Sequence, residues 1–295
     1  MKADAVLIAG PTASGKSAAA LALAQRIGGV VINADSMQVY AEPRILTARP
    51  GEAEMQGAPH LLYGHVSVRE HYSVGRYLSD AAGALAETRA MGCVPIFAGG
   101  TGLYFSALTD GIADMPSVPA AIRAATAARR AELGPEAFHA ALAARDPETA
   151  SRLRASDTQR TLRAYEVFEA TGKPLAYWQR QKGRPLLEGL ALERVVIMPP
   201  RPELHANINA RFDRMIEVGA MDEAVSLAGL DPMLPSAKLL GLRELLAVHA
   251  GTMNLEDAKT AAKAATRQYA KRQMTWFRNQ MSDWNHIDHA NLHHL

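Results

Sequence analysis

The clearest chemistry in the chain lies in residues 10–17, whose sequence GPTASGKS matches the phosphate-binding pattern G-x-x-x-x-G-K-[ST]. Glycines let the backbone turn its amides toward phosphate oxygens, and a helix that follows adds its positive N-terminal end. Lys16 would supply charge to the terminal phosphate, and the Ser17 hydroxyl can coordinate Mg²⁺. The loop predicts a phosphate ligand and leaves open ATP, GTP or an isolated diphosphate. Its residues are Gly10, Pro11, Thr12, Ala13, Ser14, Gly15, Lys16 and Ser17.

Two further polar positions follow apolar runs. Asp35 comes directly after such a run, where a carboxylate can bind Mg²⁺ indirectly or accept a proton from a nucleophile. The alternative is a helix N-cap, which both Asp35 and Ser36 could provide. Residues 99–102, GGTG, follow another run, and Thr101 offers a hydroxyl beside glycines that permit close approach of a ligand. A tight strand-to-helix turn would explain the same glycines.

Alternating strands and helices must position these groups. Short continuous apolar runs are typical of strands that are buried on both faces, and helical patterns separate them. Because parallel strands bind ligands outside their carboxyl ends, the phosphate loop, Asp35 and Thr101 are expected at one edge of a sheet. The expected strands are residues 5–9, 30–32, 94–98 and 192–198, and the expected helices include 17–27 and 77–90.

A second region interrupts this pattern. Residues 115–119 are rich in turn formers, and residues 120–178 have helical periodicity, many Ala, Arg and Glu residues and no strand candidate. The simplest account is an α/β fold, a parallel sheet flanked by helices, with an inserted all-helical domain. We predict a catalytic core at 1–114 and 191–295 and an insertion at 115–190.

Composition limits the cell compartment and the class of partner. The chain has 295 residues, 32 Lys and Arg against 30 Asp and Glu, and one cysteine, Cys93. The net charge of +2 argues against a nucleic-acid partner, although a sum says nothing about how charges are distributed. No run approaches the roughly 18 apolar residues of a membrane span, and no signal-peptide pattern is present. These features predict a soluble cytoplasmic protein.

Taken together, eight collinear segments resemble the tRNA dimethylallyltransferase family, also called tRNA isopentenyltransferases. The resemblance implies a P-loop NTPase-like core. It also implies transfer of a dimethylallyl group from dimethylallyl diphosphate to the exocyclic N6 amine of the tRNA adenine directly 3′ of the anticodon, with release of diphosphate. The segments are GPTASGKS (10–17), DSMQVY (35–40), TARP (47–50), GGTGLY (99–104), DTQRTLRAYEV (157–167), ARFDRMIEVG (210–219), LLGLRE (239–244) and TRQYAKRQMTWFR (266–278).

The resemblance also implies roles for single residues. The phosphate loop would hold the diphosphate leaving group, which Arg211 would stabilise together with Lys16, Ser17 and Mg²⁺. Asp35 would be the general base for the adenine amine, and Thr101 would lie at the reaction centre. The catalytic residues are therefore expected to be Asp35, Thr101 and Arg211, and the metal ligand Ser17.

Basic residues suggest where tRNA would bind. Lys259, Lys263, Arg267 and Lys271 recur every four residues, so on a helix they would form one stripe that could follow a phosphate backbone. Aromatic residues interleaved with this stripe could stack on bases or form the buried face of the helix. With the positions implied by the resemblance, the predicted tRNA-binding residues are Asp35, Ser36, Met37, Gln38, Thr101, Arg123, Gln159, Arg160, Arg163, Lys238, Arg243, Lys271, Arg272 and Arg278.

The chain departs from the family pattern in two places. Leu46 and Arg49 stand where many members have Gly and Lys, which leaves the shape of the loop around Thr47 open. The zinc-finger extension of eukaryotic relatives is absent, because no cysteine pair has ligand spacing. Four histidines near the C-terminus are interpreted as a solvated tail: His286, His289, His293 and His294.

Two other functions remain open on the same fold. A small-molecule kinase would use ATP on the phosphate loop and would have no affinity for RNA. A nucleotide-dependent regulatory NTPase would act as a binding module. The basic segments favour the tRNA-modifying enzyme, with the anticodon stem-loop and dimethylallyl diphosphate as partners. We expect a monomer.

Overall fold

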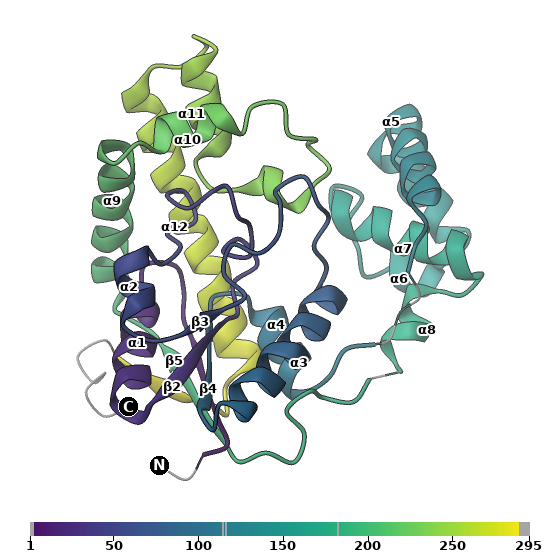
Figure 1. Cartoon of the computed structure of the whole chain (residues 1–295). Coiled ribbons are helices and arrows are strands. Elements are labelled where there is room, and N and C mark those ends of the chain that lie inside the picture. Colours follow the sequence, from purple (N-terminus) through teal and green to yellow (C-terminus); the bar gives the residue numbers. More distant parts are fainter. Residues whose placement is uncertain (1–2, 114, 116, 182, 289–295) are drawn as a thin grey trace. The chain divides into compact units, whose positions relative to one another are not determined.

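The computed structural model describes residues 3–113, 115, 117–181 and 183–288. The described residues form two compact units (Figure 1). One unit contains the residues up to Leu108 and from Leu187 onward, and the other is Thr109–Leu186. The helical unit thus interrupts the first unit in sequence.

A parallel six-stranded sheet forms the centre of the first unit, with strand order β3-β2-β4-β1-β5-β6. Each neighbouring pair is parallel, and every residue of β1 and β2 is buried. The predicted parallel sheet flanked by helices is therefore confirmed. The short edge strands β3 and β6 were not expected from the sequence. The strands are β1 Ala5–Ala9, β2 Gly29–Asn33, β3 His60–Leu61, β4 Val94–Gly99, β5 Leu192–Ile197 and β6 Asn285–Ile287.

Helices surround this sheet. Alanines on one face of α1 (Lys16–Ile27), with Leu23, pack against β-strand residues such as Ile8 and Ile96. Because alanine is small, the helix lies close to the sheet and its first residue lies beside the end of β1. The other helices of this unit are α2 Glu52–Gln56, α3 Val74–Ala90, α4 Gly102–Thr109 (whose last residue belongs to the second unit), α9 Arg201–Glu217, α10 Ala220–Ser226, η1 Pro235–Lys238, α11 Leu242–His249 and α12 Leu255–Gln280.

The regular secondary structure described in the second unit consists of helices joined by loops, and the unit has its own core. Phe138 and Leu142 of α5 pack against Tyr165 of α7 in this core. The buried Asp146 accepts hydrogen bonds from the Thr149 and Leu175 amides, at 2.9 Å each, and so joins the starts of two helices. The helices are α5 Ala120–Ala143, α6 Pro147–Ala150, α7 Thr158–Thr171 and α8 Leu175–Gln179.

The C-terminal segment differs from the sequence prediction. His286 lies in β6, where it is paired with Val196 of β5, and its Nε2 lies 2.8 Å from the Met281 carbonyl. His286 is exposed as predicted but belongs to a strand rather than to a tail, while His289, His293 and His294 lie outside the described residues. Across the described part of the chain, none of the helices is both long and apolar enough to span a membrane.

Candidate active site

The phosphate loop lies between the end of β1 at Ala9 and the start of α1 at Lys16. Gly15 has a φ of +84°, which L side chains rarely adopt. A β-carbon on Gly10 would come within 2.6 Å of the Ser14 hydroxyl oxygen, so the loop curls tightly at both ends. That Ser14 oxygen is buried and has no hydrogen-bond partner among the described residues.

Lys16 points back over this loop. Its ammonium group donates a hydrogen bond of 3.3 Å to the Pro11 carbonyl, and the residue is 8% exposed. Burial lowers the pKa of Lys16 to about 8, an effect that the Asp35 carboxylate opposes and the Arg211 guanidinium reinforces. Three charged groups therefore act on one another around the loop, and an anion bound there would favour the charged form of Lys16.

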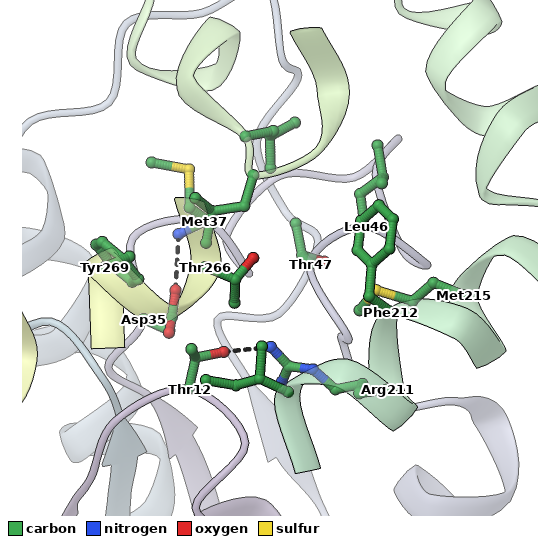
Figure 2. Close-up of a pocket in the computed structure, with 13 residues that line it drawn as sticks. Thr12, Asp35, Met37, Leu46, Thr47, Arg211, Phe212, Met215, Thr266 and Tyr269 are labelled. Carbon is green, nitrogen blue, oxygen red and sulfur yellow. Dashed lines mark hydrogen bonds between the residues drawn. The ribbon is translucent and has the colours of Figure 1, made fainter. Parts of the chain in front are cut away.

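Arg211 reaches the loop from α9. Its guanidinium donates a hydrogen bond to the Thr12 hydroxyl, although the two residues are 199 positions apart in sequence (Figure 2). Burial lowers the pKa of Arg211, and the nearby Asp35 carboxylate raises it. The loop thus has a lysine on its own helix and an arginine from a distant one, as stabilisation of a polyphosphate charge requires.

Asp35 follows β2 and is held in a defined turn. One carboxylate oxygen accepts a hydrogen bond from the Met37 amide at 3.0 Å. Asn33 holds the Asp35 backbone from both sides, accepting from its amide at 2.8 Å and donating to its carbonyl at 3.0 Å. Residues 36–39 form a turn rather than an α-helix, so Asp35 caps a turn while its second carboxylate oxygen remains available.

Thr101 joins the turn after β4 to the segment that contains Asp35. Its hydroxyl accepts a hydrogen bond from the Ser36 amide at 2.9 Å and donates to the Ser36 hydroxyl at 3.2 Å. Its own amide donates to the Ala34 carbonyl at 3.2 Å. The ends of β2 and β4 are therefore fixed to each other beside the phosphate loop.

A cavity of about 50 Å³ lies between these groups. Figure 2 shows Asp35 and Tyr269 on one side, apolar side chains such as Phe212 and Met215 on the other, and Arg211 at the base. A more open hollow of about 370 Å³ continues over the phosphate loop. The cavity is lined by Thr12, Asp35, Met37, Leu46, Thr47, Ile208, Arg211, Phe212, Met215, Leu239, Leu240, Thr266 and Tyr269.

Sequence reasoning missed Glu223, which holds one wall of this cavity. The carboxylate of Glu223 on α10 accepts hydrogen bonds from the amides of Arg44, Ile45 and Leu46, at 2.9, 2.8 and 2.8 Å. Its partners are backbone amides, which leave no signal in the sequence. The loop that Glu223 holds contains the two departures from the family pattern.

The other side of that loop is held by Gln38, whose amide donates to the carbonyls of Thr47 and Ala48 at 3.0 and 2.9 Å. Leu46 is buried and lines the cavity. Arg49 donates to the Ala41 carbonyl at 2.8 Å and lies against Gly64, where a β-carbon would clash with it. The loop is thus closed around both unusual residues.

The basic residues of α12 fall into two groups, one that contacts α9 and one that is exposed to solvent. Lys259 and Lys263 bind the Asp213 carboxylate of α9, at 3.4 and 2.7 Å, and Arg267 donates to Asn209 at 2.8 Å. The prediction that these three residues follow a phosphate backbone is therefore wrong, because they hold α12 to α9. Exposed on the same helix are Lys271, Arg272 and Arg278, and a groove there is lined by Gln268, Lys271, Arg272, Thr275, Trp276, Asn279 and Gln280.

The remaining predicted tRNA-binding residues lie in both units. In the helical unit, Gln159 and Arg160 are exposed at the start of α7, and Arg163 lies 3.9 Å from Glu166. Arg123 of α5 donates to the Val118 carbonyl at 2.9 Å. In the unit that contains the sheet, Lys238 and Arg243 are exposed.

Comparison with known proteins agrees with this geometry. A family model described as IPP transferase matches residues 38–280, and one described as isopentenyl transferase matches residues 3–69. The chain is 52% identical to a tRNA dimethylallyltransferase of Sinorhizobium medicae and 51% identical to one of Chelativorans sp., covering 97% of this chain and 95% and 99% of those chains.

Solved structures give the same result. A tRNA isopentenylpyrophosphate transferase of Bacillus halodurans matches with a TM-score of 0.67 and 32% identity, over 96% of this chain and 89% of that one. A eukaryotic dimethylallyltransferase acting on tRNA matches with a TM-score of 0.79 and 27% identity, over 97% and 73%. The likeness extends over nearly the whole length of the sequence, as the eight collinear segments predict. The chain belongs to the tRNA dimethylallyltransferase, or IPP transferase, family.

Proposed function

We propose that this protein transfers a dimethylallyl group from dimethylallyl diphosphate to the N6 amine of the tRNA adenine directly 3′ of the anticodon. One observation carries the proposal beyond family membership. A single cavity has a carboxylate, an arginine held to a phosphate loop and an apolar wall around it. The carboxylate can act as the general base, the arginine and the phosphate loop can bind the diphosphate, and the apolar wall can bind the isoprenyl chain.

The phosphate loop, Lys16 and Arg211 stabilise the leaving group. In the reaction the bond between the allylic carbon and the diphosphate oxygen breaks, and negative charge builds on the diphosphate. Preorganised cations and amides at that position lower the barrier because they need no rearrangement as the charge develops. The apolar wall of Leu46, Phe212 and Met215 would bind the five-carbon chain.

Asp35 serves the other half of the reaction. An adenine amine is a weak nucleophile, so removal of its proton as the new nitrogen–carbon bond forms assists the transfer. The carboxylate is fixed by the Met37 amide and lines the same cavity as Arg211, which supports its role as the proton acceptor. To reach this cavity, the target base must leave the anticodon-loop stack.

The donor set around the phosphate loop fits Mg²⁺ as well. Ser17, Asp35 and Glu54 line the hollow over the loop and offer oxygen ligands, and the unpartnered Ser14 hydroxyl lies in the loop itself. Mg²⁺ favours one or two protein oxygens together with phosphate oxygens, so the small number of acidic residues suits it. Ser17 would hold the ion, which would neutralise charge on the diphosphate.

Exposed basic residues support the tRNA substrate in each unit. Lys271, Arg272 and Arg278 lie on α12 near Trp276, and Gln159 and Arg160 lie at the start of α7. Such groups bind a phosphate backbone in a salt-dependent way. We propose that both sets contact the anticodon stem-loop, with the helical unit as a tRNA-binding domain, and that the enzyme is a cytoplasmic monomer.

One assay tests the proposal. The protein is incubated with Mg²⁺, radiolabelled dimethylallyl diphosphate and unmodified tRNA whose anticodon loop is rich in adenine. We expect label in the tRNA, located at the nucleotide 3′ of the anticodon after nuclease digestion. Turnover of ATP with no label in any adenine-containing tRNA would instead indicate a kinase or a regulatory NTPase.

A further inference from the structure

We propose that Gln273 of α12 is a positioning residue that sets the separation between the diphosphate loop and the Asp35 carboxylate. The inference rests on the proposed function and adds to it a residue that lines neither the cavity nor the hollow over the phosphate loop. Gln273 is 6% exposed, and both ends of its side-chain amide are used.

The two hydrogen bonds of Gln273 reach different turns. Its carbonyl oxygen accepts from the Thr12 amide at 2.9 Å, in the phosphate loop after β1. Its amide nitrogen donates to the Gly100 carbonyl at 2.8 Å, in the turn after β4. Because β1 and β4 are neighbours in the sheet, one side chain spans the gap between their carboxyl ends.

The turn at Gly100 lies directly beside the Asp35 carboxylate. A β-carbon on Gly100 would come within 2.4 Å of the Gln273 amide nitrogen and 3.2 Å of an Asp35 carboxylate oxygen. The next residue, Thr101, binds Ser36 and Ala34 on either side of Asp35. Gln273 therefore fixes Gly100, and Gly100 with its neighbour limits where the carboxylate can move.

The same side chain also determines how the phosphate loop presents its amides. An amide that donates to Gln273 cannot turn toward the ligand, so the Thr12 amide is committed to the protein. The Thr12 hydroxyl accepts from Arg211, and Thr12 is consequently held at two points. The position of the leaving group and the position of the base thus depend on one glutamine, and small misplacements of reacting groups can cost about 100-fold in rate.

Two substitutions test this role. Gln273→Leu keeps the approximate volume and removes both hydrogen bonds. We expect kcat at saturating substrates to fall by roughly 10- to 100-fold, with the Kd for tRNA within about threefold of wild type. Gln25→Leu and Gln25→Glu, on an exposed position of α1, are matched controls and should leave kcat unchanged.

Gln273→Glu separates positioning from a merely structural role. A carboxylate can accept from Thr12 but cannot donate to Gly100, whereas the protonated acid can do both. The ratio of variant to wild-type kcat should therefore rise as the pH falls from 8 to 6. The charged or titratable groups around this position are Asp35, Lys16, Arg211 and Tyr269, and because wild type has the same four groups, the ratio isolates the effect of the substituted side chain.

Binding of inorganic diphosphate with Mg²⁺, measured by calorimetry, keeps this test separate from the proposed function. Gln273→Leu should weaken diphosphate binding by roughly 10-fold. A wild-type protein that binds diphosphate and labels no tRNA would overturn the proposed function alone. Wild-type kcat and diphosphate affinity in Gln273→Leu, or a Gln273→Glu ratio that does not change with pH, would overturn the positioning role.

Discussion

Arg211 donates a hydrogen bond to the hydroxyl of Thr12, which joins α9 to the phosphate loop across 199 residues of sequence. The contact places a guanidinium over the loop before any substrate is bound. A cation that is already in position loses no binding energy to rearrangement when the diphosphate departs. Charge stabilisation at this site is therefore built into the packing of α9 against α12 and beside the phosphate loop.

Replacing Arg211 should slow the chemical step. We expect Arg211→Ala to lower kcat by about 100-fold or more, because one donor to the developing charge is lost. Arg211→Lys should recover part of this, since it keeps the charge and loses the fork geometry. Single-turnover transfer to tRNA measures the effect. Arg214→Ala, an exposed arginine on the same helix, is the control, and equal losses in both variants would contradict the assignment.

Asp35→Asn should remove the proton acceptor and leave the local turn in place. The asparagine oxygen can still accept from the Met37 amide, so folding should be little affected. Transfer should fall by roughly 10²- to 10⁴-fold, the usual contribution of a general base. The Kd for tRNA, measured by filter binding, should stay within about threefold. Full transfer activity in this variant would show that Asp35 only caps the turn.

The pH dependence of kcat/KM for dimethylallyl diphosphate should follow the protonation of Lys16. Its pKa of about 8 means that the free enzyme has the charged form below pH 8 and loses it as the pH rises. Hence kcat/KM for dimethylallyl diphosphate should fall above pH 8, by about tenfold per pH unit if the neutral form is inactive. In Lys16→Arg this fall in kcat/KM above pH 8 should disappear, because arginine stays charged. An unchanged fall in that variant would show that another group causes it.

Glu223→Ala should loosen the wall of the cavity. Three amides lose their shared acceptor, so we expect KM for dimethylallyl diphosphate to rise several-fold and the free energy of unfolding to fall by about 1–2 kcal/mol. Glu217→Ala, at an exposed position of α9, should change neither. Urea titration and initial rates measure the two effects. Unaltered KM with lost stability would limit Glu223 to a structural role.

Two exposed cations of α12 should account for part of the salt dependence of tRNA binding. Replacing Lys271 and Arg278 together by alanine should reduce the slope of log Kobs against log salt by roughly 1.5 units. At saturating tRNA, kcat should be unchanged because neither residue lines the cavity. Arg26→Ala on α1 should leave the slope as it is. An unchanged slope in the double variant would indicate that the tRNA backbone binds elsewhere.

Local sequence patterns predicted the residues that directly follow buried strands. Asp35 and Thr101 each come after a short apolar run, and parallel strands bring such positions to one edge of the sheet. Gln273 and Glu223 gave no such signal. They bind backbone groups as far as 261 and 179 residues away. Because backbone amides and carbonyls occur in nearly every residue type, such partners cannot be recognised from the sequence.

The basic stripe on α12 shows a different limit. The four-residue spacing correctly places Lys259, Lys263 and Arg267 on one face of a helix, but it does not tell which neighbour that face meets. Asp213 and Asn209 on α9 turn these cations inward. The strands β3 and β6 have two and three residues, too few for any period to be visible.

The contact between Gln273 and Thr12 also bears on how the protein is made. The ribosome synthesises the phosphate loop before α12, and the side chain that fixes the Thr12 amide lies in that helix, 261 residues later. Loop closure over such a separation follows the formation of local structure. A nascent chain can therefore fold β1, β2 and β4 before the Thr12 amide has its partner, and the diphosphate site is completed only after α12 has been synthesised.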